Sequence, residues 1–225
     1  MEKYCDKTIN QDQIDIFNKN ARIVICGGSF TGKSKLCSDL ILFYKDKFDI
    51  IIIANSPNKD ELLTALNLGE KVVVHDTIPS ISQINDYYHG HKLIVLDDNY
   101  MESFNSKEVL SFFTRGRHSN ISIILITHNL FVTKAKYSRD ISLNMTHVIL
   151  MKLRDLNQVQ ILGKQIFGKK ESQKVLDIYK YIVETYKYPH MLIDLSINSI
   201  KEIEIRSNII SDIAQNNFET TYQIM

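Results

Sequence analysis

The chain contains 225 residues, of which 44% are hydrophobic and 24% are charged, and its net charge is +1. This length can bury a substantial core, whereas the near-neutral charge excludes a general attraction to nucleic acid or to an anionic membrane. Any DNA contact must come from a local patch, or from many subunits that present the same few cations around a ring.

The sequence lacks the patterns of membrane and secreted proteins. No segment approaches the roughly 20 apolar residues that span a bilayer, and the amino terminus lacks the apolar core of a signal peptide. Its three cysteines have neither metal-ligand spacing nor an even count, which favours a reducing compartment and buried thiols. We therefore expect no membrane span and no signal peptide.

Predicted strands and helices alternate along the chain. Apolar runs predict strands at residues 22–26, 49–55, 71–75, 92–98, 121–127, 146–151 and 191–195. Helical spacing of apolar residues predicts helices at about 33–44, 80–90, 108–113, 155–167 and 171–187. Continuous β-branched runs are typical of strands covered on both faces, so the fold class is α/β, with a mostly parallel sheet and helices on both faces.

This pattern indicates one main domain with two appendages. We expect an amino-terminal extension over residues 1–20, which forms a short strand or a helix, and a domain over residues 21–197. The polar residues 198–225 predict a peripheral helix or a tail.

Residues 27–34 match G-x-x-x-x-G-K-[ST], the phosphate-binding loop (P-loop) of nucleotide hydrolases. A buried strand precedes this loop and a helix follows it, so glycine-permitted turns and the helix amino terminus together form a cradle for anions. In such a cradle Lys33 reaches the β- and γ-phosphates of ATP, and the Ser34 hydroxyl binds Mg²⁺. The predicted nucleotide-binding residues are Gly27, Gly28, Ser29, Phe30, Thr31, Gly32, Lys33, Ser34 and Lys35. The competing interpretation is a strand-to-helix turn that binds nothing.

Two carboxylates, Asp97 and Asp98, follow the apolar run that begins at Leu93. The residues between Lys33 and Asp97 leave room for two further strand–helix units, after which we expect the chain to return beside strand 22–26. Asp97 is the predicted Mg²⁺ ligand, either directly or through water, and Asp98 is the predicted base that polarises the attacking water. The alternative is a strand that ends in solvated acids.

The strand 121–127 ends in Thr127, His128 and Asn129. We expect this strand beside the one that carries Asp97, because carboxyl ends of neighbouring strands converge on the ligand crevice of an open α/β sheet. One of these three side chains is then placed to hydrogen-bond the γ-phosphate or the water. We assign that role to His128, and a plain strand-terminal turn is the competing interpretation.

These residues together resemble the FtsK/HerA-type genome-packaging ATPases of large DNA viruses, virophages and Polinton-type elements, including poxvirus members. The specific part is residues 110–131, a helix, a basic turn and a strand ending in Asn-Leu-Phe, and residues 139–144, 152–155 and 189–195 also fit. The family commonly has glutamine where His128 stands. The resemblance implies a P-loop NTPase fold of the RecA or FtsK/HerA-like type over residues 20–196.

The resemblance also implies a ring, typically hexameric, that hydrolyses ATP with Mg²⁺ and pulls double-stranded DNA into a viral capsid. Such a protein works in the host cell cytoplasm, at a viral factory, or in the virion, with capsid proteins as partners. An arginine finger from the neighbouring subunit typically supplies about 10³ to 10⁵ in rate. The candidates are Arg115, Arg117, Arg139 and Arg154, and we choose Arg117. Lys134 and Lys136 are candidates for phosphate contacts with DNA.

Two other functions use the same loop. A nucleoside or nucleotide kinase also needs a P-loop, but the chain shows no compact arginine-rich lid, and paired aspartates suit water activation better. A nucleotide-gated assembly scaffold would bind ATP and scarcely turn it over, and a lack of stimulation by DNA would favour it.

Overall fold

The computed structural model describes residues 7–8, 15–17, 20–97, 100–196, 205–207, 209–210 and 220–222. The strands are β1 Lys7–Thr8, β2 Arg22–Cys26, β3 Ile50–Ala54, β4 Val72–His75, β5 Lys92–Asp97, β6 Ile121–Thr127, β7 His147–Leu150, β8 Met191–Asp194, β9 Ile205–Ser207 and β10 Thr220–Tyr222. The α-helices are α1 Lys33–Phe43, α2 Lys59–Leu66, α3 Ile81–Tyr87, α4 Tyr100–Asn105, α5 Lys107–Arg115, α6 Ser138–Leu143, α7 Asn157–Ile166 and α8 Ser172–Thr185. Short 3-10 turns are η2 Lys45–Lys47, η3 Gly69–Lys71 and η4 Gly116–Ser119.

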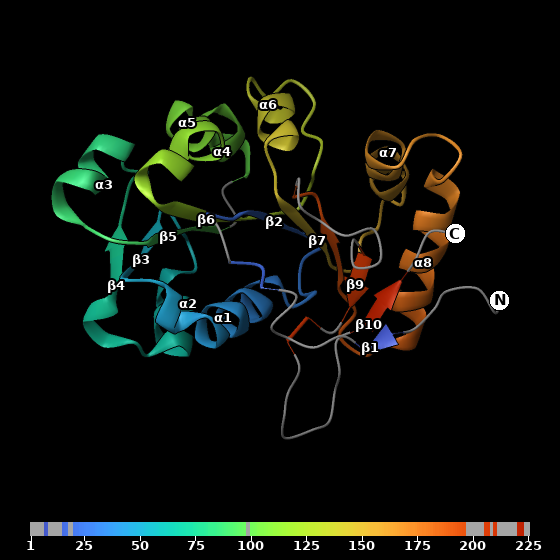
Figure 1. Cartoon of the computed structure of the whole chain (residues 1–225), viewed down its shortest axis with the longest axis horizontal. Helices are drawn as coiled ribbons and strands as arrows, with labels where there is room; N and C mark the ends of the chain where they lie inside the picture. The colour runs from blue at the N-terminus through green and yellow to red at the C-terminus, as the bar shows by residue number, and fades with distance from the viewer. Residues whose placement is uncertain are drawn as a thin grey trace.

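Within the described residues, the strands form one sheet in the order β1-β10-β9-β8-β7-β2-β6-β5-β3-β4 (Figure 1). The segment from β7 to β4 is parallel throughout. The strands β8, β9, β10 and β1 extend it as antiparallel neighbours. The predicted mostly parallel α/β sheet is confirmed.

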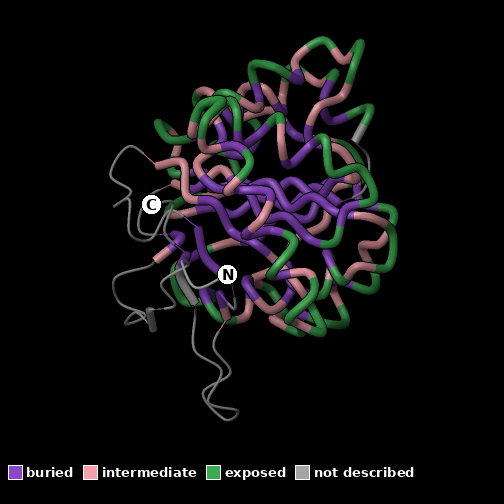
Figure 2. Tube along the Cα trace, turned by 90° about the vertical axis from the view of Figure 1, so that its right-hand side faces the viewer, coloured by how far each residue is buried: buried purple, intermediate pink, exposed green. Residues whose placement is uncertain are grey.

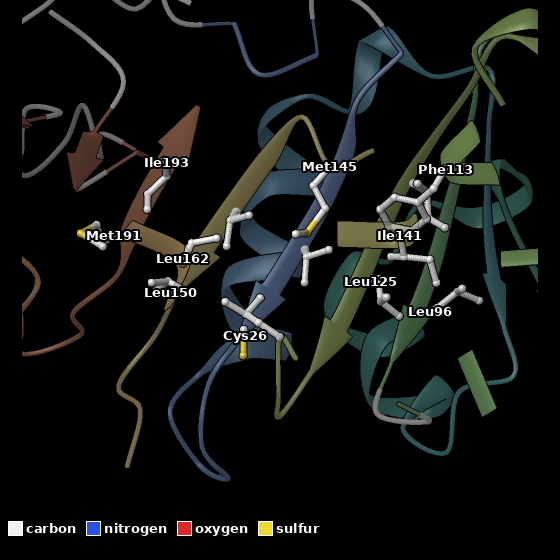
Figure 3. Packing of buried hydrophobic residues seen from close by; sticks show 14 of the residues in the cluster. Cys26, Leu96, Phe113, Leu125, Ile141, Met145, Leu150, Leu162, Met191 and Ile193 are labelled. Carbon is white, nitrogen blue, oxygen red and sulfur yellow. The ribbon is translucent and has the colours of Figure 1, made fainter. Parts of the chain in front are cut away.

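Two hydrophobic cores lie on opposite faces of the sheet, because side chains alternate along each buried strand. In β2, Val24 and Cys26 belong to the core covered by α3 to α8, whereas Ile23 and Ile25 belong to the core covered by α1 and α2. Figure 2 shows the buried strands as a central layer between more exposed segments. Figure 3 shows the first core, in which Phe113 and Ile141 from the helices approach the strands.

The strand order differs from the sequence prediction in one respect. The strand that ends in Asp97 does not return beside β2, because β6 lies between them and pairs with both. β6 is seven residues long and fully buried, which suits a position with neighbours on both sides. The prediction that β6 lies beside β5 is confirmed, and β6 additionally borders the P-loop strand.

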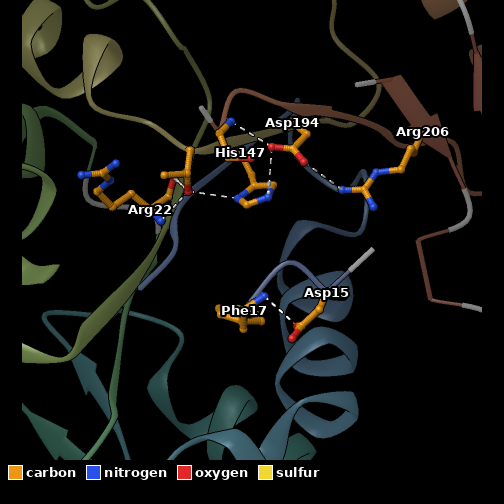
Figure 4. Close-up of polar contacts among 8 residues, drawn as sticks. Asp15, Phe17, Arg22, His147, Asp194 and Arg206 are labelled. Carbon is orange, nitrogen blue, oxygen red and sulfur yellow. Dashed lines mark hydrogen bonds and ion pairs between the residues drawn. The ribbon is translucent and has the colours of Figure 1, made fainter. Parts of the chain in front are cut away.

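The prediction of a helix or tail over residues 198–225 is wrong for β9 and β10. β9 and Tyr222 of β10 are buried, and their polar groups have partners across the sheet. Arg206 of β9 is 1% exposed and lies 3.8 Å from Asp194 of β8 (Figure 4). The hydroxyls of Ser207 and Tyr222 are 3.1 Å apart.

Candidate nucleotide-binding site

The carboxyl ends of the parallel strands bring the site together. The P-loop follows β2, Asp97 ends β5, and His128 follows β6. The turn that leads to α2 follows β3 at the same edge, and the segment after β7 flanks the P-loop on its other side. This edge is where open α/β sheets bind ligands.

The P-loop is held by main-chain hydrogen bonds to both neighbouring strands. Gly27 N–H donates to Thr127 O at 3.2 Å, and Gly28 N–H donates to Lys152 O at 3.0 Å. Phe30 and Gly32 have φ values of 60° and 90°, in the left-handed region that turns successive amides toward one point. These two conformations are compatible with the predicted anion cradle.

Lys33 is the residue of the loop that carries charge into the cradle. Its side chain is 7% exposed, and its ammonium donates to Gly28 O at 2.9 Å. The same nitrogen lies 3.4 Å from His128 Nδ1. The structure therefore brings together the predicted phosphate-binding lysine and the predicted sensor.

His128 connects the end of β6 to the P-loop. Its Nδ1 also lies 3.1 Å from Gly27 O. One ring nitrogen cannot donate to a carbonyl and accept from an ammonium at the same time, so only one of these two contacts is a hydrogen bond in any one protonation state. The position of Lys33 is thereby linked to the tautomer and charge of His128.

Of the other strand-end residues, Thr127 and Asn129 shape the turn. The Thr127 hydroxyl is buried and donates to Asn129 O at 3.0 Å. The side-chain oxygen of Asn129 accepts from Gln158 Nε2 at 3.1 Å. Thr127 contacts the P-loop through its backbone carbonyl, whereas His128 is placed to contact it through its side chain.

A second group of polar atoms surrounds Asp97, whose side chain is 1% exposed. Its Oδ2 accepts from the Ser34 hydroxyl at 3.2 Å and from Asn58 Nδ2 at 3.4 Å. A serine hydroxyl beside a buried carboxylate supplies the oxygen ligands that Mg²⁺ prefers, and phosphate and water oxygens complete such a site. Ser34 and Asp97 therefore fit the predicted metal-binding pair.

The thiols near this site are buried, as predicted for the described cysteines. Burial, with the charge of Asp97 as a second cause, raises the pKa of Cys37. Burial also raises the pKa of Cys26 to about 12, opposed by the charge of Lys33. Both thiols therefore act as apolar core groups at neutral pH. Cys5 lies outside the described residues.

Two predicted site residues lie elsewhere. The Lys35 side chain is exposed and forms an ion pair with Asp39 on α1, so only its backbone amide belongs to the first turn of the helix. Arg117 is exposed in η4, which precedes β6, so it lies at the opposite end of β6 from His128. Asp98, the predicted base, lies outside the described residues.

Asn58 is the site residue that the sequence analysis missed. It stands just before α2, where asparagine is typical of a turn or helix cap. The signal that could have found it is its place after β3, at the same sheet edge as the P-loop.

The fold is shared with known nucleotide-hydrolysing proteins, although no family model and no curated protein matches the sequence. The genome packaging NTPase B204 from Sulfolobus turreted icosahedral virus 2, in complex with sulfate, gives a TM-score of 0.57 at 16% identity, over 82% of this chain and 96% of that chain. Its complex with AMPPCP gives 0.55 at 18% identity, over 82% and 97%. B204, the DNA-packaging ATPase from Sulfolobus turreted icosahedral virus, gives 0.53 at 14% identity, over 79% and 94%.

At these identities the likeness establishes the fold. The chain has the P-loop α/β fold of these viral packaging NTPases, as the sequence predicts. The predicted resemblance to viral genome-packaging ATPases is confirmed at the level of the fold. Among the helices of the described segments, none combines the length and apolar character required to cross a bilayer.

Proposed function

We propose that this protein is an ATP-hydrolysing motor that translocates double-stranded DNA into a viral capsid. The observation that carries the proposal is the convergence of Lys33, Ser34 and Asp97 at one sheet edge, with Ser34 Oγ 3.2 Å from Asp97 Oδ2. The fold shared with packaging NTPases supports it.

The residues divide the chemistry of hydrolysis among them. Lys33 and the loop amides bind the β- and γ-phosphates and stabilise the charge that develops there. Mg²⁺, held by Ser34 and Asp97, would neutralise charge on the same phosphates. Asp98 accepts a proton from the attacking water, whose oxygen bonds to the γ-phosphorus while the bond to the bridging oxygen breaks, giving ADP and phosphate. His128 responds to the γ-phosphate through its contact with Lys33.

The motor acts as an oligomeric ring, hexameric in the proposal, with Arg117 completing the site of the neighbouring subunit. DNA is gripped through its phosphates, without sequence preference. Lys134 and Lys136 support this, because both are exposed in the segment that connects β6 to α6. Their loop is held to α4 by Lys136 N–H, which donates to Asn105 Oδ1 at 2.8 Å. Capsid proteins are the other proposed partners, in the host cytoplasm or the virion.

ATP hydrolysis measured with and without double-stranded DNA tests the proposal. We expect hydrolysis that DNA stimulates and that Lys33→Ala abolishes, together with the binding of AMPPCP. Lys45→Ala, which removes an exposed lysine beyond the end of α1, is the control and should keep both activities. Transfer of the γ-phosphate to a nucleoside, or binding of AMPPCP without turnover, would contradict the proposal.

The predicted base has its own test. Asp98→Asn should bind ATP with unchanged affinity and fail to hydrolyse it, because the amide cannot accept the proton of water. Turnover at the wild-type rate would show that another group activates the water.

A further inference from the structure

Helices α7 and α8 form a hairpin, here called the α7–α8 hairpin, over residues 157–185. The two helices approach closely at Gly163, where an added Cβ would lie 3.2 Å from Ser172 Cα and 3.3 Å from Val175 Cβ. Both helices pack their apolar faces into the core that also includes β6 and β7. The hairpin therefore shares one hydrophobic core with the two strands that flank the P-loop strand.

Gln158 of α7 holds the loop after β6. Its side chain is 8% exposed and makes two hydrogen bonds to that loop. Its Oε1 accepts from Leu130 N–H at 2.9 Å, and its Nε2 donates to Asn129 Oδ1 at 3.1 Å. Leu130 is 1% exposed, so loss of the Gln158 amide would leave a buried N–H without this acceptor.

Tyr179 of α8 holds the segment after β7 in the same manner. Leu153 N–H donates to its hydroxyl at 2.7 Å, and the hydroxyl donates to Met151 O at 2.9 Å. Burial raises the pKa of Tyr179 to about 12, so the phenol remains protonated and able to donate at alkaline pH as well as at neutral pH. One hydroxyl thus fixes both ends of residues 151–153.

Each of these two segments contacts a different glycine of the P-loop. The first segment carries His128, whose Nδ1 lies 3.1 Å from Gly27 O and 3.4 Å from Lys33 Nζ. The second carries Lys152, whose carbonyl accepts from Gly28 N–H at 3.0 Å. Gln158 and Tyr179 therefore each bond to a segment that in turn contacts the P-loop, one segment on each side of it.

We propose that Gln158 and Tyr179 are positioning residues for hydrolysis, which hold the segments 128–130 and 151–153 so that the P-loop, Lys33 and His128 keep their productive geometry. This inference rests on the proposed ATPase function for its kinetic consequence. Its structural consequence, the order of the P-loop, does not depend on turnover.

Amide exchange of Gly27 and Gly28, followed by NMR in the full chain, tests the structural consequence. Gln158→Met should speed exchange at Gly27, whose N–H donates to the carbonyl of Thr127, directly before segment 128–130. Tyr179→Phe should speed exchange at Gly28, whose N–H donates to Lys152 O within segment 151–153. Each increase should be about 10-fold, because each change removes the support of one segment. Gln165→Met and Tyr181→Phe are matched controls, since these residues are exposed on the same two helices. The controls should leave both glycines unchanged.

Steady-state kinetics test the second consequence. Misplacing a catalytic group by about 1 Å costs up to roughly 100-fold in rate, so both variants should lower kcat by about 10- to 100-fold with little change in KM. A substitution at a residue that only fills the core would lower the stability of the protein without lowering kcat selectively over KM. In a His128→Ala background, Gln158→Met should cause little further loss of kcat, whereas its effect on unfolding should remain.

The exchange measurement and the kinetic measurement together distinguish a failure of the proposed ATPase function from a failure of the positioning role. A wild-type chain that hydrolyses no ATP would overturn the proposed function, and the exchange rates would still decide the positioning role. Unchanged exchange at both glycines, or unchanged kcat in an active enzyme, would overturn the positioning role alone.

Discussion

The Ser34 hydroxyl donates a hydrogen bond of 3.2 Å to Asp97 Oδ2, which joins the first turn of α1 to the carboxyl end of β5. These residues are far apart in the sequence, and β2, the strand that leads into α1, does not pair with β5, because β6 lies between the two strands. The contact places the hydroxyl that follows the P-loop lysine beside the one buried carboxylate of β5. It therefore fixes where a metal-bound phosphate would lie on this sheet edge.

Asn58 should tune that metal site from its position behind Asp97. Its Nδ2 donates to Asp97 Oδ2 at 3.4 Å, so it orients the carboxylate without being a predicted ligand. Loss of such an orienting partner typically costs roughly 10- to 100-fold in metal affinity. We expect Asn58→Ala to raise by that factor the Mg²⁺ concentration needed for half-maximal hydrolysis, measured by titration. Nucleotide affinity in EDTA should stay unchanged, and a wild-type Mg²⁺ titration would exclude the role of Asn58.

Gly27 should tolerate no side chain. An added Cβ would lie 2.5 Å from Met151 Cβ and 2.8 Å from Thr31 Oγ1, too close for either neighbour to remain in place. Overpacking of this kind costs about 1 to 3 kcal/mol, so Gly27→Ala should lower the free energy of unfolding by that amount in urea. Gly28→Ala is the control, because its nearest neighbour is Lys152 O at 3.4 Å, an ordinary contact. Equal stability of the two variants would contradict this packing argument.

The grouping of the candidate site residues was predictable from the sequence because its signals are local. A glycine loop, a lysine and a hydroxyl stand in one continuous stretch, and Asp97 directly follows a buried strand. Since parallel strands present their carboxyl ends at one edge, residues such as Lys33 and His128 can be placed together before the strand order is known.

The strand order and the polar strands could not be predicted, because both depend on contacts between distant segments. The position of β6 between β2 and β5 is set by pairing on both sides of it. Arg206 and Ser207 look like surface residues until Asp194 and Tyr222 face them across the sheet. Asn58 looked like a turn residue for the same reason, since nothing nearby in sequence identifies Asp97 as its partner.

The buried pair of His147 and Asp194, shown in Figure 4, should make stability depend on pH. The two side chains are 3.5 Å apart. His147 begins β7 and pairs with Ile23 near the start of β2, whereas the P-loop follows the end of β2. The pKa of His147 is lowered from 6.5 to about 4, chiefly by burial and also by the charges of Arg206 and Arg22, whereas the charges of Asp194 and Asp15 oppose this shift. Between pH 6.5 and about 4 the unfolded chain binds a proton that the folded chain does not. Stability should therefore fall as the pH falls through that window and level off below it.

Urea unfolding at pH 7.5 and at pH 5 measures this effect. The other histidines with lowered pKa values, His91 and His190, act in the same direction, so only the difference between the wild type and His147→Gln identifies the contribution of His147. Glutamine keeps a polar group beside Thr146, whose hydroxyl lies 3.0 Å from the histidine Nδ1. The variant should lose less stability between the two pH values. An equal loss in both proteins would show that His147 is protonated in the folded state.

If Arg117 acts in hydrolysis as proposed, it must act in the site of a neighbouring subunit, because it lies at the opposite end of β6 from the P-loop. It lies in η4, before the first residue of β6, and its carbonyl accepts from Asn20 Nδ2 at 2.8 Å. The P-loop contacts the other end of β6, and a strand of this length spans about 20 Å. A cation at that distance cannot touch a γ-phosphate bound in the same chain.

A mixing experiment tests whether Arg117 acts across the subunit boundary. Arg117→Ala and Lys33→Ala should each be inactive alone, the first because a missing finger costs about 10³ to 10⁵ in rate. Rings that contain both variants should regain ATP hydrolysis, because some boundaries then combine an intact P-loop from one subunit with an intact arginine from the next. Lys33→Ala mixed with Asp97→Asn should recover nothing, since both changes damage the same half of the site. If the first mixture also stays inactive while forming rings of normal mass, Arg117 is not the residue that completes the neighbouring site.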